Sequence, residues 1–295
     1  MKNSFCFIKK IGKKLCFFCS KEKPRVMHVA LNGVIGKDSR FSSGLNIESV
    51  FPLLKKAFED KEIKAVAITI NSPGGSPVQS ELIYKAIREF SESKKIPVYT
   101  FARDVAASGG YWLLLSGDEI YAHNSSIIGS IGVIFSGFGF VDAIKRLGVE
   151  RRIYTEGKNK AILDPFMPEE QENIEILKDA QRDIFEGFKD FVKSRRKEKL
   201  KGDEKFLNEK IFTGAFWSGR KAVELGLVDE IADMRSKIQE KFGEKVEIIE
   251  VNAKKGFLKS LLSEKTSATN NAVSRTIGET LNQIEERLKF GQFGL

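Results

Sequence analysis

Short runs of β-branched and apolar residues alternate with amphipathic stretches from Val26 onward, and this alternation constrains the fold more than any other feature. Between the runs, residues 47–58 and 82–90 carry apolar side chains at a 3.6-residue period, which predicts helices. We expect strands at "VMHVALN", "KAVAITI", "PVYTFA", "DEIYAH", "IGVIF", "RRIYT" and "VEIIEV". The alternation predicts an α/β architecture with a largely parallel, buried sheet and flanking helices.

The chain of 295 residues divides most simply into one folded domain with a segment at each end. We expect a tail over residues 1–25, the domain over 26–251, and a polar linker with a C-terminal amphipathic helix over 252–295. The apolar stripe of that helix predicts packing against its own domain or a contact between subunits. It consists of Val273, Ile277, Leu281, Ile284 and Leu288.

The N-terminal tail carries most of the net charge of +9, because residues 1–25 hold eight basic side chains against one acid. Nucleic-acid binders spread basic residues over a folded face, so we expect no nucleic-acid partner. The stretch "SFCFIKKIGKKLCFFC" is too short and too rich in lysine to span a bilayer. Its helical projection separates apolar from basic residues, which predicts binding to an anionic membrane surface. A disordered tail and a degenerate export signal are the alternatives.

All three cysteines, Cys6, Cys16 and Cys19, lie in this tail. No disulfide framework can therefore hold the body of the protein together. Cys16 and Cys19 have the CxxC spacing, but no second pair follows, and we predict no metal site.

The stretch "INSPGGSPVQS" follows a predicted buried strand and carries the first glycine-rich site. Pro73 and the two glycines, Gly74 and Gly75, predict a tight turn with close backbone approach. Ser76 is placed to cap a helix that begins at Pro77, with Gln79 in the position of a capping box. The turn presents bare backbone N–H groups, which predicts an anion site, although a purely structural turn is the alternative.

The stretch "DVAASGGYW" follows another predicted strand and carries the second site. It places Ser108 at the start of an apolar helix, where backbone donors surround a hydroxyl. Capping alone would explain a serine there. We interpret the small neighbours, Ala106, Ala107, Gly109 and Gly110, as room for a substrate carbonyl group.

A nucleophilic serine needs a base, and the sequence offers few candidates. The two histidines, His28 and His123, lie in predicted strands, where most histidines are structural. A lysine replaces histidine when desolvation lowers its pKa. Lys160 is followed by "AILDPFM", whereas Lys158 has polar neighbours, so we predict Lys160 as the base.

Four motifs in order, "INSPGGS", "AASGGYW", "GSIGVI" and "GKNKAILDP", resemble those of the signal peptide peptidase A family of Ser-Lys membrane peptidases, in its single-domain, SohB-like form. The resemblance covers about residues 26–251 and implies a Clp protease/crotonase-like fold. It further implies Ser108 as nucleophile and Lys160 as general base. Gly75 and Gly109 would be oxyanion donors, and Ser130 would orient the lysine.

The resemblance also implies a serine endopeptidase that hydrolyses hydrophobic, membrane-derived peptides such as remnant signal peptides, without metal or other cofactor. The aromatic stretch "FSGFGF" after Ser130 is a candidate lining for an apolar groove. Members of this length imply a homo-oligomer that encloses its active sites. They imply association with the bacterial inner membrane, but the lysine-interrupted tail leaves the side of the membrane open.

Two other functions fit the glycine-rich sites. An enoyl-CoA hydratase-like enzyme would use the same backbone donors to hold a thioester enolate and would need no nucleophile. A non-catalytic membrane scaffold could keep the fold without the reaction. A serine-directed probe separates the peptidase from both alternatives, since neither alternative requires a reactive Ser108.

Overall fold

The computed structural model of the chain describes residues 23–36, 44–252, 290–291 and 293. Residues 1–22 of the predicted tail, with the three cysteines, and the apolar stripe of the C-terminal helix lie outside the described residues. Arg25, the last residue of the predicted tail, begins the first strand. The proposed division at residues 25 and 251 therefore stays a prediction.

An eight-stranded sheet forms the centre of the protein and confirms the predicted α/β class. Its main path runs β6-β5-β3-β2-β1-β8, while β4 pairs with β3 and with β7. Every strand pair is parallel except β5 with β6. The strands are β1 (Arg25–Asn32), β2 (Ala65–Ser72), β3 (Val98–Ala107), β4 (Glu119–Ala122), β5 (Ile127–Gly129), β6 (Phe216–Ser218), β7 (Glu230–Ile231) and β8 (Glu247–Glu250).

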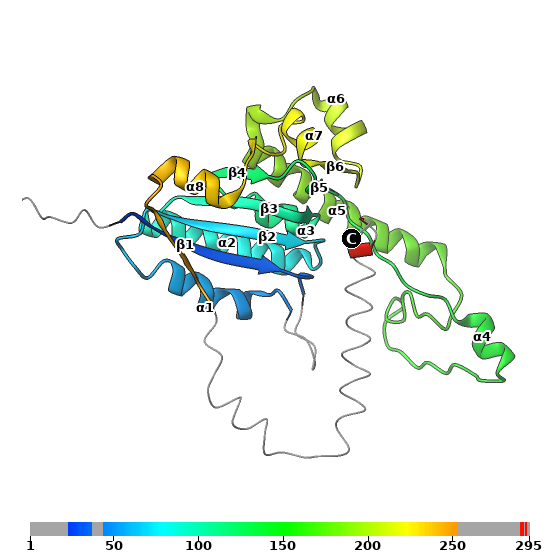
Figure 1. The fold of residues 1–295 in the computed structure, drawn as a ribbon. Coiled ribbons are helices and arrows are strands. Elements are labelled where there is room, and N and C mark those ends of the chain that lie inside the picture. The colour runs from blue at the N-terminus through cyan, green and yellow to red at the C-terminus, as the bar shows by residue number, and fades with distance from the viewer. Residues whose placement is uncertain (1–22, 37–43, 253–289, 292, 294–295) are drawn as a thin grey trace, which may run out of the picture.

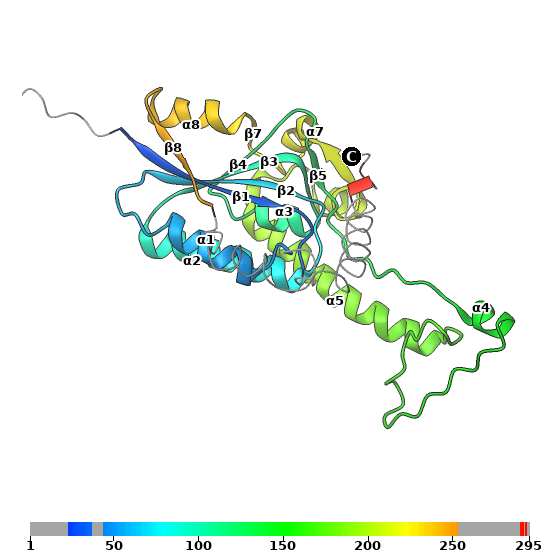
Figure 2. The ribbon, with the colours of Figure 1, turned by 60° about the horizontal axis from the view of Figure 1, so that its bottom comes forward.

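Helices cover both faces of this sheet (Figures 1 and 2), with α1 and α2 on one face and α8 on the other. The α-helices are α1 (Ile47–Ala57), α2 (Pro77–Lys94), α3 (Gly109–Leu114), α4 (Val141–Arg146), α5 (Gln171–Arg196), α6 (Glu204–Phe206), α7 (Gly219–Glu224) and α8 (Met234–Phe242). A 3-10 turn, η1 (Lys197–Lys199), and a π-helical turn, η2 (Leu207–Ile211), complete the elements.

Two apolar clusters correspond to the two faces. The larger one packs β1, β2 and β3 against α1, α2, α3 and α5, and it includes Leu54, Ile83, Leu113 and Val192. The smaller one, built around Phe101, Tyr121 and Ile238, packs the opposite face against α8. Because β2 is buried on both faces, its sequence reads as an almost continuous apolar run.

The start of α2 matches the sequence prediction in part. Ser76 is the N-cap, its hydroxyl accepts from the Gln79 N–H, and Pro77 is the first helical residue. The Gln79 side chain does not complete the predicted capping box. It accepts instead from the N–H of Ile47 at 2.9 Å, which ties the start of α2 to the start of α1.

Two of the predicted strands, "IGVIF" and "RRIYT", are wrong. Both contribute to a projection, residues 133–170, which we call the arm. Figure 2 shows the arm, with α4, extending away from the sheet beyond the start of α5. A hydrogen bond from the Phe140 N–H to the Pro165 carbonyl (2.6 Å) and an ion pair between Arg151 and Asp164 (2.8 Å) join its two sides. Within the described part of the chain neither run is paired as a strand. The Ile131 carbonyl still accepts from the Gly214 N–H at 3.0 Å, but the chain then leaves the sheet to form the arm.

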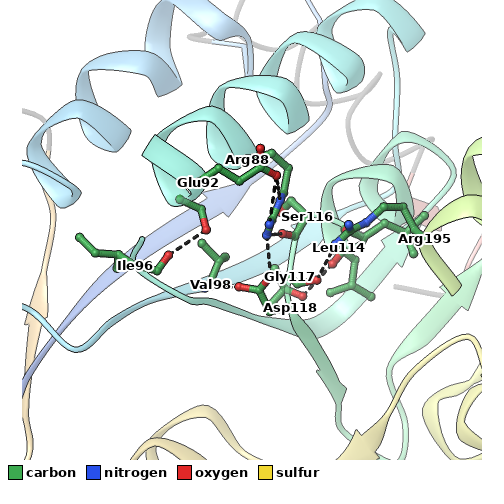
Figure 3. Close-up of polar contacts among 12 residues, drawn as sticks. Arg88, Glu92, Ile96, Val98, Leu114, Ser116, Gly117, Asp118 and Arg195 are labelled. Atoms are coloured by element: carbon green, nitrogen blue, oxygen red, sulfur yellow. Dashed lines mark hydrogen bonds and ion pairs between the residues drawn. The ribbon is translucent and has the colours of Figure 1, made fainter. Parts of the chain in front are cut away.

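Two arginines from neighbouring helices hold the chain that follows α3 (Figure 3). Arg88 of α2 donates to the Ser116 carbonyl at 3.1 Å and pairs with Asp118 at 2.8 Å. Arg195 of α5 donates to the carbonyl oxygens on either side of Ser116, each at 3.0 Å. Guanidinium groups satisfy the carbonyls that a short helix leaves unpaired, so the position of α3 is fixed from two sides.

We expect Gly110→Ala to destabilise the protein by about 3 kcal/mol, because overpacking against backbone is poorly relieved. A Cβ there would lie 2.4 Å from the Ser72 carbonyl oxygen. Gly187→Ala is the matched control, since a Cβ on Gly187 in α5 meets nothing within 4 Å. That change should stabilise the protein by about 0.5 to 1 kcal/mol. Urea denaturation measures both, and equal stabilities of the two variants would contradict the packing argument.

Candidate active site

The ends of β2 and β3 meet at one edge of the sheet. The turn at Gly74–Gly75 follows β2, and Ser108 follows β3 as the N-cap of α3. A Cβ built on Gly74 would lie 2.8 Å from both the Gly109 nitrogen and the Ser108 Cβ. Real Cβ atoms do not approach so closely, so only glycine lets the turn lie against the serine.

Gly75 is held with its amide free. Ile35, from the segment after β1, hydrogen-bonds to the residues on both sides of Gly75. The Ile35 N–H donates to the Gly74 carbonyl at 2.9 Å, and the Ser76 N–H donates to the Ile35 carbonyl at 2.8 Å. A Cβ on Gly75 would lie 1.9 Å from the Ile35 oxygen. No local pattern around Ile35 indicates that it holds Gly75, so the sequence alone did not predict this role.

Two N–H groups without an acceptor among the described residues therefore lie close to Ser108. Within the described part of the chain, neither the Gly75 nor the Gly109 N–H donates to a backbone or side-chain acceptor. The two residues are close, because a Cβ on Gly109 would lie 3.4 Å from the Gly75 nitrogen. Paired free amides are the donor set that stabilises the oxyanion of an acyl-transfer intermediate.

Ser108 has an unusual backbone conformation. Its φ is 52° and its ψ is −121°, which L-residues other than glycine rarely adopt, and its side chain makes no capping hydrogen bond. The Ser108 N–H donates to the Gly129 carbonyl at 2.8 Å, which attaches this strained residue to β5. Capping therefore does not explain the serine. Among the residues that the structure describes, its hydroxyl makes no hydrogen bond and is available for chemistry.

Ser130 lies at the end of the neighbouring strand. Ala107 of β3 is in register with Gly129 of β5, so Ser130 and Ser108 follow adjacent strand ends. Ser130 also has a positive φ of 52°, and its N–H donates to the Ala215 carbonyl at 2.7 Å. The structure thus brings together four of the five predicted site residues: Ser108, Gly75, Gly109 and Ser130.

The other small residues serve packing rather than substrate access, so our interpretation of them as room for a carbonyl group is wrong. Ala106 and Ala107 are fully buried within β3. Gly110 lies against the Ser72 backbone. Their size lets the β2 and β3 ends approach α3, and only Gly109 also supplies a free donor.

Lys160 is not brought to Ser108 within this chain. It is exposed and lies on the arm, in a tight turn where its N–H donates to the Gly157 carbonyl at 3.2 Å. The apolar residues that follow it therefore do not bury its amine in a single chain. Lys158 is also exposed, and Glu172 accepts from its ammonium at 2.7 Å. This hydrogen bond raises the pKa of Lys158, which disfavours it as a base.

A groove of 290 Å³ begins two residues beyond Ser130. Apolar side chains from three segments, Val133, Phe185 and Phe212, contribute to its lining, with Lys178 and Arg182 of α5 beside them. The predicted lining residues of "FSGFGF" lie elsewhere: Phe135 and Phe138 are exposed on the arm. Phe185 and Phe212 are far from the glycine motifs in sequence, so only the tertiary structure identifies them.

Comparison with known proteins gives consistent matches. A family model for peptidase family S49 matches residues 91–247. A putative signal peptide peptidase SppA of Enterococcus faecium is 32% identical over 278 residues, covering 90% of this chain and 78% of that protein. The chloroplastic serine protease SPPA of Arabidopsis thaliana is 29% identical over 266 residues, covering 86% of this chain and 38% of that protein.

A longer protein of Brucella abortus, named Na(+)/H(+) antiporter NhaA, is 45% identical over 256 residues. The match covers 85% of this chain but 34% of that protein. The chain thus spans about a third of this relative's length, and the match identifies a homologous segment rather than a shared whole.

Neither histidine is expected to take part in a reaction at this site. His28 lies within β1, where its Nε2 and the Thr69 hydroxyl are 3.0 Å apart. Burial is the main cause that lowers its pKa from 6.5. Stability from a neutral, partly buried histidine is present above pH 6.5 and is lost as the pH falls through the folded-state value. We expect His28→Gln to leave peptide hydrolysis within about twofold of wild type and to flatten the acid-side loss of unfolding free energy.

The measurement is the free energy of unfolding between pH 7 and pH 5, beside hydrolysis of an unfolded apolar peptide at neutral pH. His123→Gln is the control, because that side chain is exposed. A large loss of hydrolysis in either variant, with the fold intact, would place a histidine in the mechanism.

Proposed function

The chain belongs to peptidase family S49, the signal peptide peptidase A family that its motifs predict, and we propose that it is a serine endopeptidase with Ser108 as the nucleophile. The observation that carries this proposal is the free hydroxyl of a strained serine beside two unused backbone amides. That arrangement supplies a nucleophile and its oxyanion donors without further rearrangement.

In the proposed reaction, the Ser108 oxygen attacks the carbonyl carbon of the scissile peptide bond while a base accepts the hydroxyl proton. The carbonyl oxygen becomes an oxyanion and accepts hydrogen bonds from the Gly75 and Gly109 N–H groups. Collapse of this intermediate breaks the carbon–nitrogen bond, and the same base returns the proton to the leaving amine. Water, deprotonated by the base, then hydrolyses the acyl-enzyme and frees Ser108.

We assign the base to a neutral Lys160, oriented by a hydrogen bond to the Ser130 hydroxyl. Within one chain Lys160 lies on the arm, so the proposal requires the arm of one copy to reach the Ser108 of another. The surface of the arm supports this. Large apolar side chains stand exposed along it, with Ile134 86%, Phe138 81% and Tyr154 92% exposed. Exposed apolar surface of this extent is typical of a protein interface, and burial there would also desolvate the lysine.

For the substrate we propose hydrophobic peptides, including remnant signal peptides. The groove that begins two residues beyond Ser130 is lined in part by Val133, Phe185 and Phe212, which supports a substrate with apolar side chains. The Enterococcus relative is itself named a signal peptide peptidase. A closed homo-oligomer would limit access to extended chains, which is a physical reason for dividing the dyad between copies.

Association with a membrane remains part of the proposal, through the basic amphipathic stretch of residues 1–25 and its attraction to anionic lipid. Among the described residues, no helix has the length and apolar character needed to cross a bilayer.

The enoyl-CoA hydratase-like alternative uses the same two amides, but it gives no reason for a strained serine with an unused hydroxyl. The scaffold alternative needs neither the two amides nor the strained serine. Both alternatives predict a protein that a serine-directed fluorophosphonate leaves unlabelled.

We expect the full-length protein to be labelled by a fluorophosphonate at Ser108, and Ser108→Ala to abolish labelling. Lys160→Ala should lower the labelling rate by about a hundredfold or more, the contribution of a general base. Lys158→Ala is the matched control, as it removes an arm lysine paired with Glu172. It should label at the wild-type rate. Labelling that persists in Ser108→Ala would refute the assignment of the nucleophile.

Co-expression of Ser108→Ala with Lys160→Ala tests whether two copies share the dyad. If the lysine comes from a second copy, random assembly should restore labelling at the wild-type rate in about a quarter of the sites, although Ser108→Ala alone is unlabelled and Lys160→Ala alone is labelled slowly. Active-site titration of the purified mixture gives this fraction. A mixture as inactive as its parts would show that the serine and its base belong to the same chain.

A further inference from the structure

Strand β3 changes its neighbour partway along its length. Its first half pairs with β4 and its last three residues, from Val105 to Ala107, pair with β5. At the changeover the register with β2 shifts: Ile70 lies opposite Ala102, but Ser72 lies opposite Ala106. The extra residues of β3 form a bulge, and bulges next to active sites redirect the residues that follow.

The side chain of Asn71 fills this irregularity. Its Oδ1 accepts from the Val105 N–H at 3.1 Å, which replaces a backbone bond of the ladder. Its Nδ2 donates to Asp104 Oδ2 at 2.9 Å. The Val105 N–H needs an acceptor and the Asp104 carboxylate needs a donor, at similar distances from β2. The side-chain amide of asparagine supplies both groups.

Asn71 lies shortly before both the segment that carries Gly75 and, through its bond to Val105, the segment that carries Ser108. Ser108 lies three residues beyond Val105, and Gly75 lies four residues beyond Asn71 itself. The Asn71 carbonyl also accepts from the Gly33 N–H at 2.9 Å, in the segment that leads to Ile35. A shift at Asn71 therefore moves the nucleophile relative to an oxyanion donor.

We propose that Asn71 is a positioning residue, which sets the placement of Ser108 against Gly75 by bridging the bulge between β2 and β3. This inference rests on the proposed function, because it concerns the geometry of Ser108 as a nucleophile. Asn71 does not contact the substrate in this proposal. It acts through the register of β3.

The test reverses the donor and acceptor across the bulge. Asn71→Asp sets a carboxylate against the carboxylate of Asp104 and removes the donor. We expect it to lower the fluorophosphonate labelling rate of Ser108 and kcat by at least about tenfold, with KM for an apolar peptide nearly unchanged. In the double variant Asn71→Asp/Asp104→Asn, the new amide donates to the new carboxylate, and the Val105 N–H keeps an acceptor. Labelling should recover to within about threefold of wild type.

Asn208→Asp is the matched control. The Asn208 amide also donates to a carboxylate, Glu204 Oε1 at 3.2 Å, on a surface turn. It should not change labelling. Thermal unfolding of every variant separates misfolding from misplacement, and rates are compared only among variants that are folded at the assay temperature.

Wild-type labelling at Ser108 with an unchanged rate in Asn71→Asp would overturn the positioning role while leaving the proposed function intact. A slow Asn71→Asp variant that the second substitution does not rescue would also overturn it. If the wild-type protein is not labelled at Ser108, the proposed function itself fails. The two failures are therefore distinguishable.

Discussion

The close contact between the Gly74–Gly75 turn and the Ser108–Gly110 segment is the constraint on which the rest of the structure depends. The two backbones approach so closely that a Cβ on Gly74 would lie 2.8 Å from both the Gly109 nitrogen and the Ser108 Cβ. This contact places two unused amides beside one hydroxyl. The same contact demands that β2 and β3 end together, which their parallel pairing in the sheet ensures.

The surrounding structure supports strain at this edge. Ser108 and Ser130 both have positive φ values, a conformation that costs about 1 to 3 kcal/mol per residue. Hydrogen bonds from their N–H groups to the Gly129 and Ala215 carbonyls hold them in place. At the other end of α3, Arg88 and Arg195 fix the chain from two neighbouring helices. The site is thus rigid on its body side.

The arm contrasts with this rigid edge. It carries Lys160 and a series of exposed apolar side chains, and its contacts within the described chain are largely internal. In the proposed function, catalysis requires assembly, because the base reaches Ser108 only when the arm of another copy binds. An isolated subunit would then be a poor peptidase, which protects unfolded proteins before assembly.

The sequence by itself determined the α/β class, the largely parallel sheet and the place of Ser108 beside a glycine-rich turn, because strand periodicity and glycine turns are local signals. Gly75, Gly109 and Ser130 were chosen from the resemblance of the motifs to a known family. The strands predicted at "IGVIF" and "RRIYT" are wrong, because apolar residues on an exposed segment give the same local pattern as those of a buried strand. Only the tertiary structure decided that Ile35 leaves the Gly75 amide free, that Asn71 bridges the bulge, and that Lys160 stands apart from Ser108. These features depend on contacts between distant segments, and no local pattern encodes which segment lies beside which.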